Sequence, residues 1–339
     1  MKKILVAMSG GVDSAAACVL LKKKGYEVGG GTMLLRDGGE QELSDAREAA
    51  KQLNIPFHAF DLREAFYERV ITPFMQVYQA GGTPNPCVVC NGAMKFGLFL
   101  EKALSLGYDG IATGHYARLV TENDRFLLKI AADRRKDQTY MLCMLSQFQL
   151  AHTLFPLGDV VSKDETRALA VEAGLDLAKK RDSQDICFVP DGDYMRYLTN
   201  HGVVPQEGNF ISPDGKIYGA HRGMEAYTVG QRRGLGLAFG ERVYVLGKQG
   251  TDVVLGQEEN LFSKRVLVQD VNYIPFDQLQ SPIRVQAKLR YTPRTADALL
   301  LPTENGCELQ FDEPQRAVTS GQTAVFYDGD TVLGGGIIV

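Results

Sequence analysis

The sequence has no run of about 18 apolar residues, few cysteines and no excess of basic charge. Without such a run no transmembrane helix is expected, and the N-terminus enters a strand-like segment without a signal-peptide core, so we predict a cytoplasmic protein with no membrane partner. Six cysteines in 339 residues are too few for a disulfide scaffold, so in a reducing compartment they are free, metal-bound or catalytic. A net charge of −4 argues against a protein coated in basic charge for nucleic acid.

One local segment is nevertheless basic. Residues 284–294 contain Arg284, Lys288, Arg290 and Arg294 and no acidic residue. Such a stripe fits a nucleic-acid backbone, although a single cluster of this kind is more often a solvated face. With 45% hydrophobic residues the chain can bury a core, and its length predicts two or three domains.

Residues 3–24 have the pattern strand, glycine-rich loop, helix. An apolar run precedes Gly10 and Gly11, which allow a tight turn that brings backbone N–H groups to a ligand. The positive end of the helix and the neighbouring serine hydroxyls predict a polyphosphate site, and Asp13 beside phosphates is well placed to hold Mg²⁺. The alternative is a plain strand-to-helix turn in which Asp13 only caps the helix.

The sequence of this loop, Ser-Gly-Gly-Val-Asp-Ser, is neither a Walker P-loop nor a dinucleotide fingerprint. It resembles the pyrophosphate loop of the ATP pyrophosphatases. In that family ATP is cut between its α and β phosphates, AMP passes to an oxygen of the substrate, and pyrophosphate stays in the loop. The resemblance implies that ATP is a substrate of this chain.

Strands and helices alternate over residues 3–60, which predicts a parallel sheet with helices on both faces and a ligand at the carboxyl ends of the strands. Met33, at the end of the second strand, would then lie beside an adenine, or is simply core. From about residue 200 short β-rich stretches replace the helices. We therefore expect an α/β fold with a parallel-sheet domain, a small central domain and a C-terminal β-barrel, over residues 1–195, 196–262 and 263–339.

Three cysteines lie in segments that the sequence predicts to be loops. Cys87 and Cys90 fall in residues 80–91, which are rich in glycine and proline, and Cys187 lies in a polar segment before a proline. Helices are predicted on both sides of residues 80–91, the first with a break near Pro73. Three alternatives stay open: half of a zinc site, a thioredoxin-like pair, or two thiols that meet and carry sulfur. The thioredoxin-like alternative is weak because the CxxC opens no predicted helix after a first strand.

Five further motifs accompany the loop. They are Thr83-Pro84-Asn85-Pro86-x-x-x-Cys90-Asn91, Ala112–Arg118, Lys136–Tyr140, Asp185–Phe188 and Tyr227–Gly236. Together with the loop they run in order over nearly the whole chain, which resembles the tRNA-specific 2-thiouridylases. The resemblance implies that sulfur replaces the C2 oxygen of the wobble uridine, position 34, in the anticodon loops of Lys, Glu and Gln tRNAs.

The resemblance also implies a role for each matching residue. Cys90 would be the nucleophile and Cys187 would carry a persulfide. ATP would be bound by Ala7, Met8, Ser9, Gly10, Gly11, Val12, Asp13, Ser14, Met33 and Gly114. The target base would be bordered, and tRNA contacted, by Asn85, Pro86, Cys87, His115, Lys136, Asp137, Gln138, Arg290, Tyr291 and Gln322.

The chain departs from this family at two places. Cys87 stands where an aspartate is usual, and the loop after Met33 is short where many members have an extended segment with a tryptophan, a residue that this chain lacks. The first departure changes the chemistry expected at the base pocket. The second suggests a different loop contact with tRNA.

The implied chemistry needs ATP, Mg²⁺ and a sulfur donor such as a cysteine desulfurase or a sulfur-relay protein. Adenylation turns the C2 oxygen into a leaving group, a persulfide supplies sulfur, and attack by the second thiol leaves the pair as a disulfide that a reductant must reset. Two other functions remain. One is an adenylating ligase or amidotransferase for a small molecule, which has no use for a cysteine pair, and the other is a redox-sensing RNA-binding protein without turnover.

Overall fold

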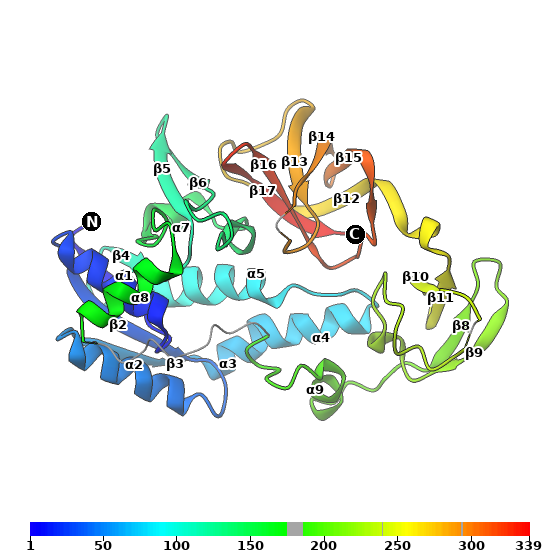
Figure 1. The fold of residues 1–339 in the computed structure, drawn as a ribbon, viewed down its shortest axis with the longest axis horizontal. Coiled ribbons are helices and arrows are strands. Elements are labelled where there is room, and N and C mark those ends of the chain that lie inside the picture. Colours follow the sequence, from blue (N-terminus) through cyan, green and yellow to red (C-terminus); the bar gives the residue numbers. More distant parts are fainter. Residues whose placement is uncertain (175–185, 239, 293) are drawn as a thin grey trace.

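The computed structural model describes residues 1–174, 186–238, 240–292 and 294–339. Within these ranges an α/β part, a small β-sheet and a β-barrel are arranged along one long axis (Figure 1). None of the helices described is both long enough and apolar enough to cross a membrane. Ile186 and Cys187 are described, whereas Asp185, the first residue of their motif, lies outside the described residues.

The first sheet is parallel throughout, with the strand order β3-β2-β1-β4-β7. The strand order reverses at β1, and the gap between β1 and β4 is the switch point at which open α/β sheets bind ligands. The apolar run of β1 is fully buried, as the sequence predicts. The strands are β1 (Lys3–Ala7), β2 (Glu27–Leu34), β3 (Phe57–Asp61), β4 (Gly110–Ala112) and β7 (Thr153–Leu154).

Helices cover both faces of this sheet because side chains alternate along β1. Ile4 and Val6 pack with α1 and α2, whereas Leu5 packs with α6. One face carries α1 (Val12–Lys23), α2 (Glu40–Gln52) and α8 (Lys163–Glu172), and the other carries α6 (Phe99–Ser105) and α7 (Gln147–Ala151). The parallel-sheet prediction is confirmed.

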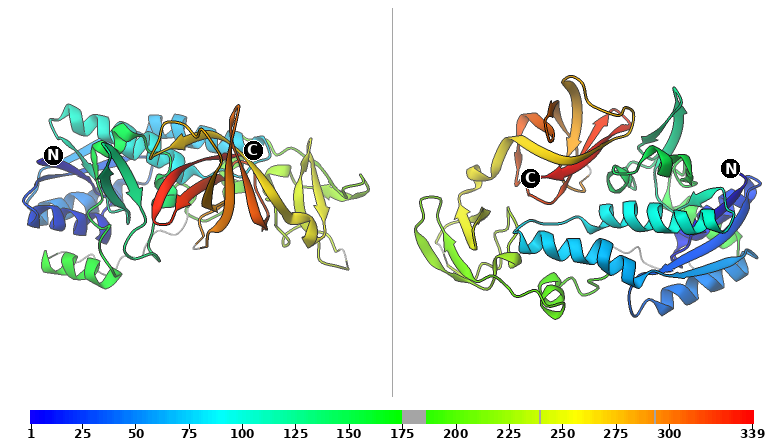
Figure 2. Two further views of the ribbon diagram at one scale, coloured as in Figure 1. Left: turned by 90° about the horizontal axis from the view of Figure 1, so that it is seen from above. Right: turned by 180° about the vertical axis from the view of Figure 1, so that it is seen from behind.

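Two long helical segments run side by side from this sheet toward the small β-sheet (Figures 1 and 2). The first consists of α3 (Arg63–Phe66), the π-helical η1 (Tyr67–Ile71) and α4 (Thr72–Gln79), and the second of α5 (Pro86–Cys90), the π-helical η2 (Asn91–Leu98) and α6. The predicted break near Pro73 does not occur. Proline lacks an N–H and crowds the carbonyl four residues back, and the wider π turn accommodates it without ending the helix.

The loop predicted over residues 80–91 is wrong in its second half. Helix α5 begins at Pro86, with Asn85 as N-cap. A proline is favourable at the first helical position because its missing N–H has no partner there in any case. Cys87 and Cys90 therefore lie on the first turn of a helix. This helix follows α4 and not a strand, so one half of the argument against a thioredoxin-like pair is removed and the other half remains.

The small sheet has the order β10-β11-β8-β9, and the barrel closes because β12 pairs with both β15 and β17. This confirms the predicted fold class. The strands are β8 (Gly208–Ile211), β9 (Ile217–His221), β10 (Tyr244–Gln249), β11 (Asp252–Gly256), β12 (Phe262–Tyr273), β13 (Ile283–Lys288), β14 (Ala296–Thr303), β15 (Gly306–Arg316), β16 (Thr323–Asp328) and β17 (Thr331–Ile338). Short helices connect the parts: η3 (Thr139–Leu142), α9 (Tyr194–Asn200), η4 (Met224–Ala226) and η5 (Glu258–Leu261).

A hairpin of the N-terminal part extends the barrel sheet. It consists of β5 (Arg118–Glu122) and β6 (Arg125–Lys129), and Lys129 pairs with Thr331 of β17. The hairpin agrees with the alternating pattern of the sequence, but its attachment to the barrel has no local signal.

Candidate functional site

The predicted phosphate loop connects β1 to α1. Gly10 has a φ of 67°, and a Cβ there would lie 2.7 Å from the Cβ of Asp45, so both conformation and space demand glycine. The hydroxyl of Ser14 donates to the carbonyl of Gly11 at 3.0 Å and accepts from the N–H of Ser9 at 3.3 Å. Ser14 is buried, so its hydroxyl holds the loop in shape.

Two other predicted ATP contacts lie at neighbouring strand ends. A Cβ on Gly114 would lie 2.9 Å from the carbonyl carbon of Asp13 and the nitrogen of Ser14, so only glycine lets the chain after β4 approach the loop. Met33, near the end of β2, packs both against the core beneath the sheet and against the cluster that contains Cys90. The predicted nucleotide edge and the predicted thiol site are therefore adjacent.

Asp13 is held by partners that the sequence did not predict. The ammonium of Lys163, the first residue of α8, lies 2.8 Å from both carboxylate oxygens. The hydroxyl of Tyr116 donates to one of them at 2.8 Å and lies 3.0 Å from the hydroxyl of Thr166. The side chain of Lys163 is only 14% exposed. Because the ammonium covers both oxygens, Mg²⁺ reaches Asp13 only if Lys163 moves.

Cys87, Cys90 and Cys187 lie close together. Phe188, next to Cys187, shares an apolar cluster with Cys90, and its ring centroid lies 5.1 Å from that of Phe74. Cys87 and Cys187 are exposed, whereas Cys90 is buried. Burial raises the pKa of Cys90 to about 11, Lys95 lowers it, and Cys187 and Cys87 raise it, so the thiols lie within electrostatic reach of one another. Across the described ranges, no group of three or more His, Cys, Asp or Glu residues is arranged to hold a metal ion.

Lys95 is a second residue that the sequence did not predict. After burial it is the largest influence on the pKa values of Cys87 and Cys90, and it also lowers that of Cys187. It lies five positions after Cys90, in η2. The segment between Cys90 and Lys95 is π-helical, and the Lys95 ammonium acts on all three thiols from there.

Replacing Lys95 by methionine should slow alkylation of Cys87 and Cys187 at pH 8 about threefold to tenfold, because loss of the ammonium raises both thiol pKa values and lowers the thiolate fraction. The measurement is the rate of iodoacetamide labelling as a function of pH, with peptide mapping. Lys95→Arg is the matched control and should keep rates near those of the parent. Equal pH profiles in the parent and Lys95→Met would show that the ammonium does not act on the thiols.

Predicted tRNA contacts converge at the start of α5. The amide of Gln322, in the barrel, donates to the carbonyls of Thr83 at 3.0 Å and Pro84 at 3.3 Å. The buried hydroxyl of Tyr140 donates to the carbonyl of Thr323 in the barrel at 2.7 Å, and the side chain of Asn85 is close enough to lower the pKa of this tyrosine, which burial raises. The barrel and the segment around η3 therefore fix the residues that lead into the CxxC.

Asp137 is an internal anchor. It is buried, accepts from the hydroxyl of Thr139 at 2.7 Å and from the N–H of Ala131 at 3.1 Å, and faces Lys288 of the barrel. Its carbonyl accepts from the hydroxyl of Tyr291, whose ring remains 54% exposed. Of this pair, Tyr291 has the accessible surface that an RNA base can meet.

Two further residues that were predicted to contact tRNA form hydrogen bonds within the protein. Nδ1 of His115 lies 2.7 Å from the hydroxyl oxygen of Thr113, and burial holds the pKa of this histidine well below its usual range, so its ring is neutral at pH 7. The side-chain oxygen of Gln138 accepts from the N–H of Tyr116 at 3.0 Å. Because Tyr116 also holds Asp13, Gln138 supports the phosphate loop from a distance.

The predicted basic stripe is not one continuous surface. Arg284 forms an ion pair with Asp312, Lys288 is buried, and Arg290 donates to the carbonyl of Arg316 at 2.7 Å. Arg290 bonds carbonyls through one guanidinium nitrogen, which leaves its other donors for phosphate. Arg294, the fourth cation of the stripe, is exposed.

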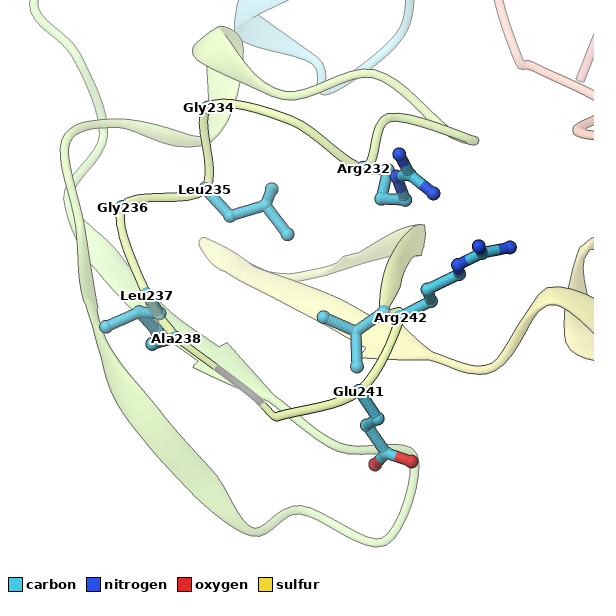
Figure 3. Close-up of a pocket in the computed structure, with 9 residues that line it drawn as sticks. Arg232, Gly234, Leu235, Gly236, Leu237, Ala238, Glu241 and Arg242 are labelled. Carbon is cyan, nitrogen blue, oxygen red and sulfur yellow. The ribbon is translucent and has the colours of Figure 1, made fainter.

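The motif Tyr227–Gly236 lies in the central part, between η4 and β10. Its last residues line an open pocket of about 490 Å³, with Arg232 and Arg242 on the same side (Figure 3). No predicted site residue lies there. The hydroxyl of Thr228 lies 3.4 Å from that of Thr83, so the motif also contacts the segment that leads into the CxxC.

Fold and site together define a class: an α/β protein with a predicted phosphate loop, in which the strand ends predicted to bind the nucleotide adjoin a cluster of thiols. A family model described as the tRNA methyl transferase HUP domain matches residues 2–191. Models of a tRNA methyl transferase PRC-barrel domain and an aminomethyltransferase beta-barrel domain match residues 196–255 and 263–338.

Curated relatives identify the family. The chain is 46% identical over 353 residues to tRNA-specific 2-thiouridylase MnmA 2 of Clostridium botulinum (strain Okra / Type B1), with 99% of each chain covered. It is 47% identical over 350 residues to MnmA 1 of Clostridium tetani (strain Massachusetts / E88), covering 99% of this chain and 96% of that one. Among solved structures, NMN synthetase from Francisella tularensis is similar at 17% identity and a TM-score of 0.35, over 53% of this chain and 66% of that one. The chain belongs to the tRNA-specific 2-thiouridylase family, which confirms the resemblance.

Proposed function

We propose that this member of the family uses ATP to adenylate the C2 oxygen of uridine 34 in tRNA and replaces that oxygen with sulfur from a persulfide. The observation that carries the proposal is the contact between nucleotide edge and thiol cluster, where Met33 packs against the residues around Cys90 and Phe188. An adenylating ligase for a small molecule has no use for thiols at this position. The names of the curated relatives support the same reaction.

ATP fits the loop because Gly10 allows its tight turn and the N-terminus of α1 favours anionic phosphate. Asp13 would hold Mg²⁺ together with phosphate oxygens, since this ion commonly takes one or two carboxylates plus substrate phosphates, and the bound ion would neutralise charge on the departing pyrophosphate. Lys163 would leave Asp13 at that stage. Its ammonium is then available to a phosphate oxygen, so the site keeps its charge balance.

Sulfur transfer divides between two thiols in this proposal. Cys187 receives a persulfide from a donor such as a cysteine desulfurase or a sulfur-relay protein, and its exposure permits docking. Cys90 attacks the inner sulfur of that persulfide, the terminal sulfur passes to C2 of the adenylated base, and AMP leaves. The products are 2-thiouridine and a Cys90–Cys187 disulfide. We place the catalytic domain in residues 1–195, the linking domain in 196–262 and the tRNA-contacting barrel in 263–339.

The test is release of pyrophosphate from ATP in the presence and absence of tRNA. With a Lys, Glu or Gln tRNA the parent protein should release pyrophosphate in step with 2-thiouridine formation. The matched control is the same tRNA with cytidine at position 34, which should give neither product. Release without tRNA would favour the small-molecule ligase, and no release under any condition would favour an RNA-binding protein without turnover.

A further inference from the structure

We propose that Cys87 is a resolving cysteine, which attacks the Cys90–Cys187 disulfide, takes Cys90 as its own partner and frees Cys187 for the next persulfide. The inference rests on the proposed function, because that reaction supplies the disulfide. It also gives a role to the residue at which this chain departs from the aspartate usual in its family.

The positions of the cysteines permit this exchange. Cys87 and Cys90 are three positions apart on the first turn of α5, where their Cβ atoms are expected to lie about 5–6 Å apart. A disulfide needs a Cβ separation of about 3.5–4.5 Å, so a small adjustment of the turn is enough. The first turn can adjust at little cost because its N–H groups have no partners within the helix.

Exposure divides the roles of the three thiols. Cys87 and Cys187 are exposed, whereas Cys90 lies in the apolar cluster with Phe188. Either disulfide of Cys90 therefore presents one exposed sulfur to an external reductant, and the exchange matters because it frees Cys187, the thiol that receives the persulfide. The buried thiol of Cys90 is a partner in both disulfides, first with Cys187 and then with Cys87.

Charges around the thiols favour attack at one particular sulfur. Lys95 lowers the pKa of all three thiols, and Arg36 lowers that of Cys187. Cys187 in turn raises the pKa of Tyr197, although burial and Tyr67 raise it more. Burial raises the pKa of Cys90 to about 11, which makes it a poor leaving group. Attack on Cys90 with departure of the exposed Cys187 is therefore favoured over the reverse.

The exchange is balanced. The thiolate of Cys87 attacks the sulfur of Cys90, a new bond forms between them, and the bond from Cys90 to Cys187 breaks. Cys187 leaves as a thiolate and takes up the proton that Cys87 lost, so there is no net oxidation. An external dithiol protein of the thioredoxin class then supplies two electrons and two protons to the Cys87–Cys90 disulfide.

The test is disulfide mapping by mass spectrometry after rapid alkylation. Persulfide-loaded protein is given ATP and tRNA for a single turnover. In the parent the Cys87–Cys90 disulfide should exceed Cys90–Cys187 by about tenfold or more. In Cys87→Ser the Cys90–Cys187 disulfide should accumulate instead. Cys87→Asp, which restores the residue usual in the family, is the matched control and should behave as Cys87→Ser.

A second arm omits tRNA, so that it tests the exchange by itself. One equivalent of diamide should leave the parent oxidised at Cys87–Cys90 with Cys187 free to react. A predominant Cys90–Cys187 disulfide in the parent, in either arm, would overturn the role of Cys87. Absence of 2-thiouridine in all variants, with normal exchange in the diamide arm, would instead contradict the proposed function.

Discussion

Replacing Asp13 by alanine should lower tRNA-dependent pyrophosphate release by about a thousandfold or more, because the phosphate loop then lacks its carboxylate for Mg²⁺. Binding of tRNA should stay close to that of the parent, since Asp13 lies at the start of α1 and not on the barrel. The measurements are pyrophosphate release and tRNA binding on the same preparation. Asp164→Ala is the matched control, because its carboxylate lies on the same α8 that supplies Lys163 but is 91% exposed.

A measurement of stability separates the role of Asp13 as a magnesium ligand from its role as the ion-pair partner of Lys163. Removing the carboxylate leaves the half-buried ammonium of Lys163 without this partner, which should lower the free energy of unfolding by about 1–3 kcal/mol. The double variant Asp13→Ala with Lys163→Met should regain stability but not pyrophosphate release. Normal release by Asp13→Ala would contradict the assignment of the ATP site.

Replacing Cys187 by serine should give a protein that consumes ATP on tRNA but inserts no sulfur. A hydroxyl cannot form a persulfide, whereas the phosphate loop and the start of α5 do not depend on this side chain. Pyrophosphate and 2-thiouridine should be measured in one reaction, and 2-thiouridine should fall below detection.

Cys87→Asp is the control for the Cys187→Ser result, and it should keep first-turnover thiolation. If Cys187→Ser forms 2-thiouridine at the normal rate, the persulfide is carried elsewhere. Cys143 is a poor substitute because it is completely buried and a Cβ on Gly335 would lie 2.8 Å from its sulfur, which leaves no room for a further sulfur atom.

Sequence reasoning succeeded where the signal was local. The apolar run before Gly10, the glycines themselves and the alternation of strands and helices determine the loop and the parallel sheet without reference to distant residues. It failed at α5, because glycine and proline around residues 80–91 indicate a loop unless the proline occupies the first helical position.

Contacts between residues far apart in the chain could not be predicted from local sequence patterns. Lys163 meets Asp13 across 150 positions, and the residues around Lys163 give no sign of that partner. Lys95 acts on the thiols from η2, whose π-helical geometry has no periodic sequence pattern of its own.

The attachment of the β5–β6 hairpin to the barrel has a consequence for biosynthesis. Lys129 leaves the ribosome early, but its partner Thr331 is among the last residues made, and at about 5–20 residues per second the hairpin waits on the order of ten seconds or more. An unpaired strand edge is prone to pairing with other chains, and charged side chains such as those of Arg125 and Lys129 discourage it. The nascent protein thus keeps this edge soluble until the barrel arrives to cover it.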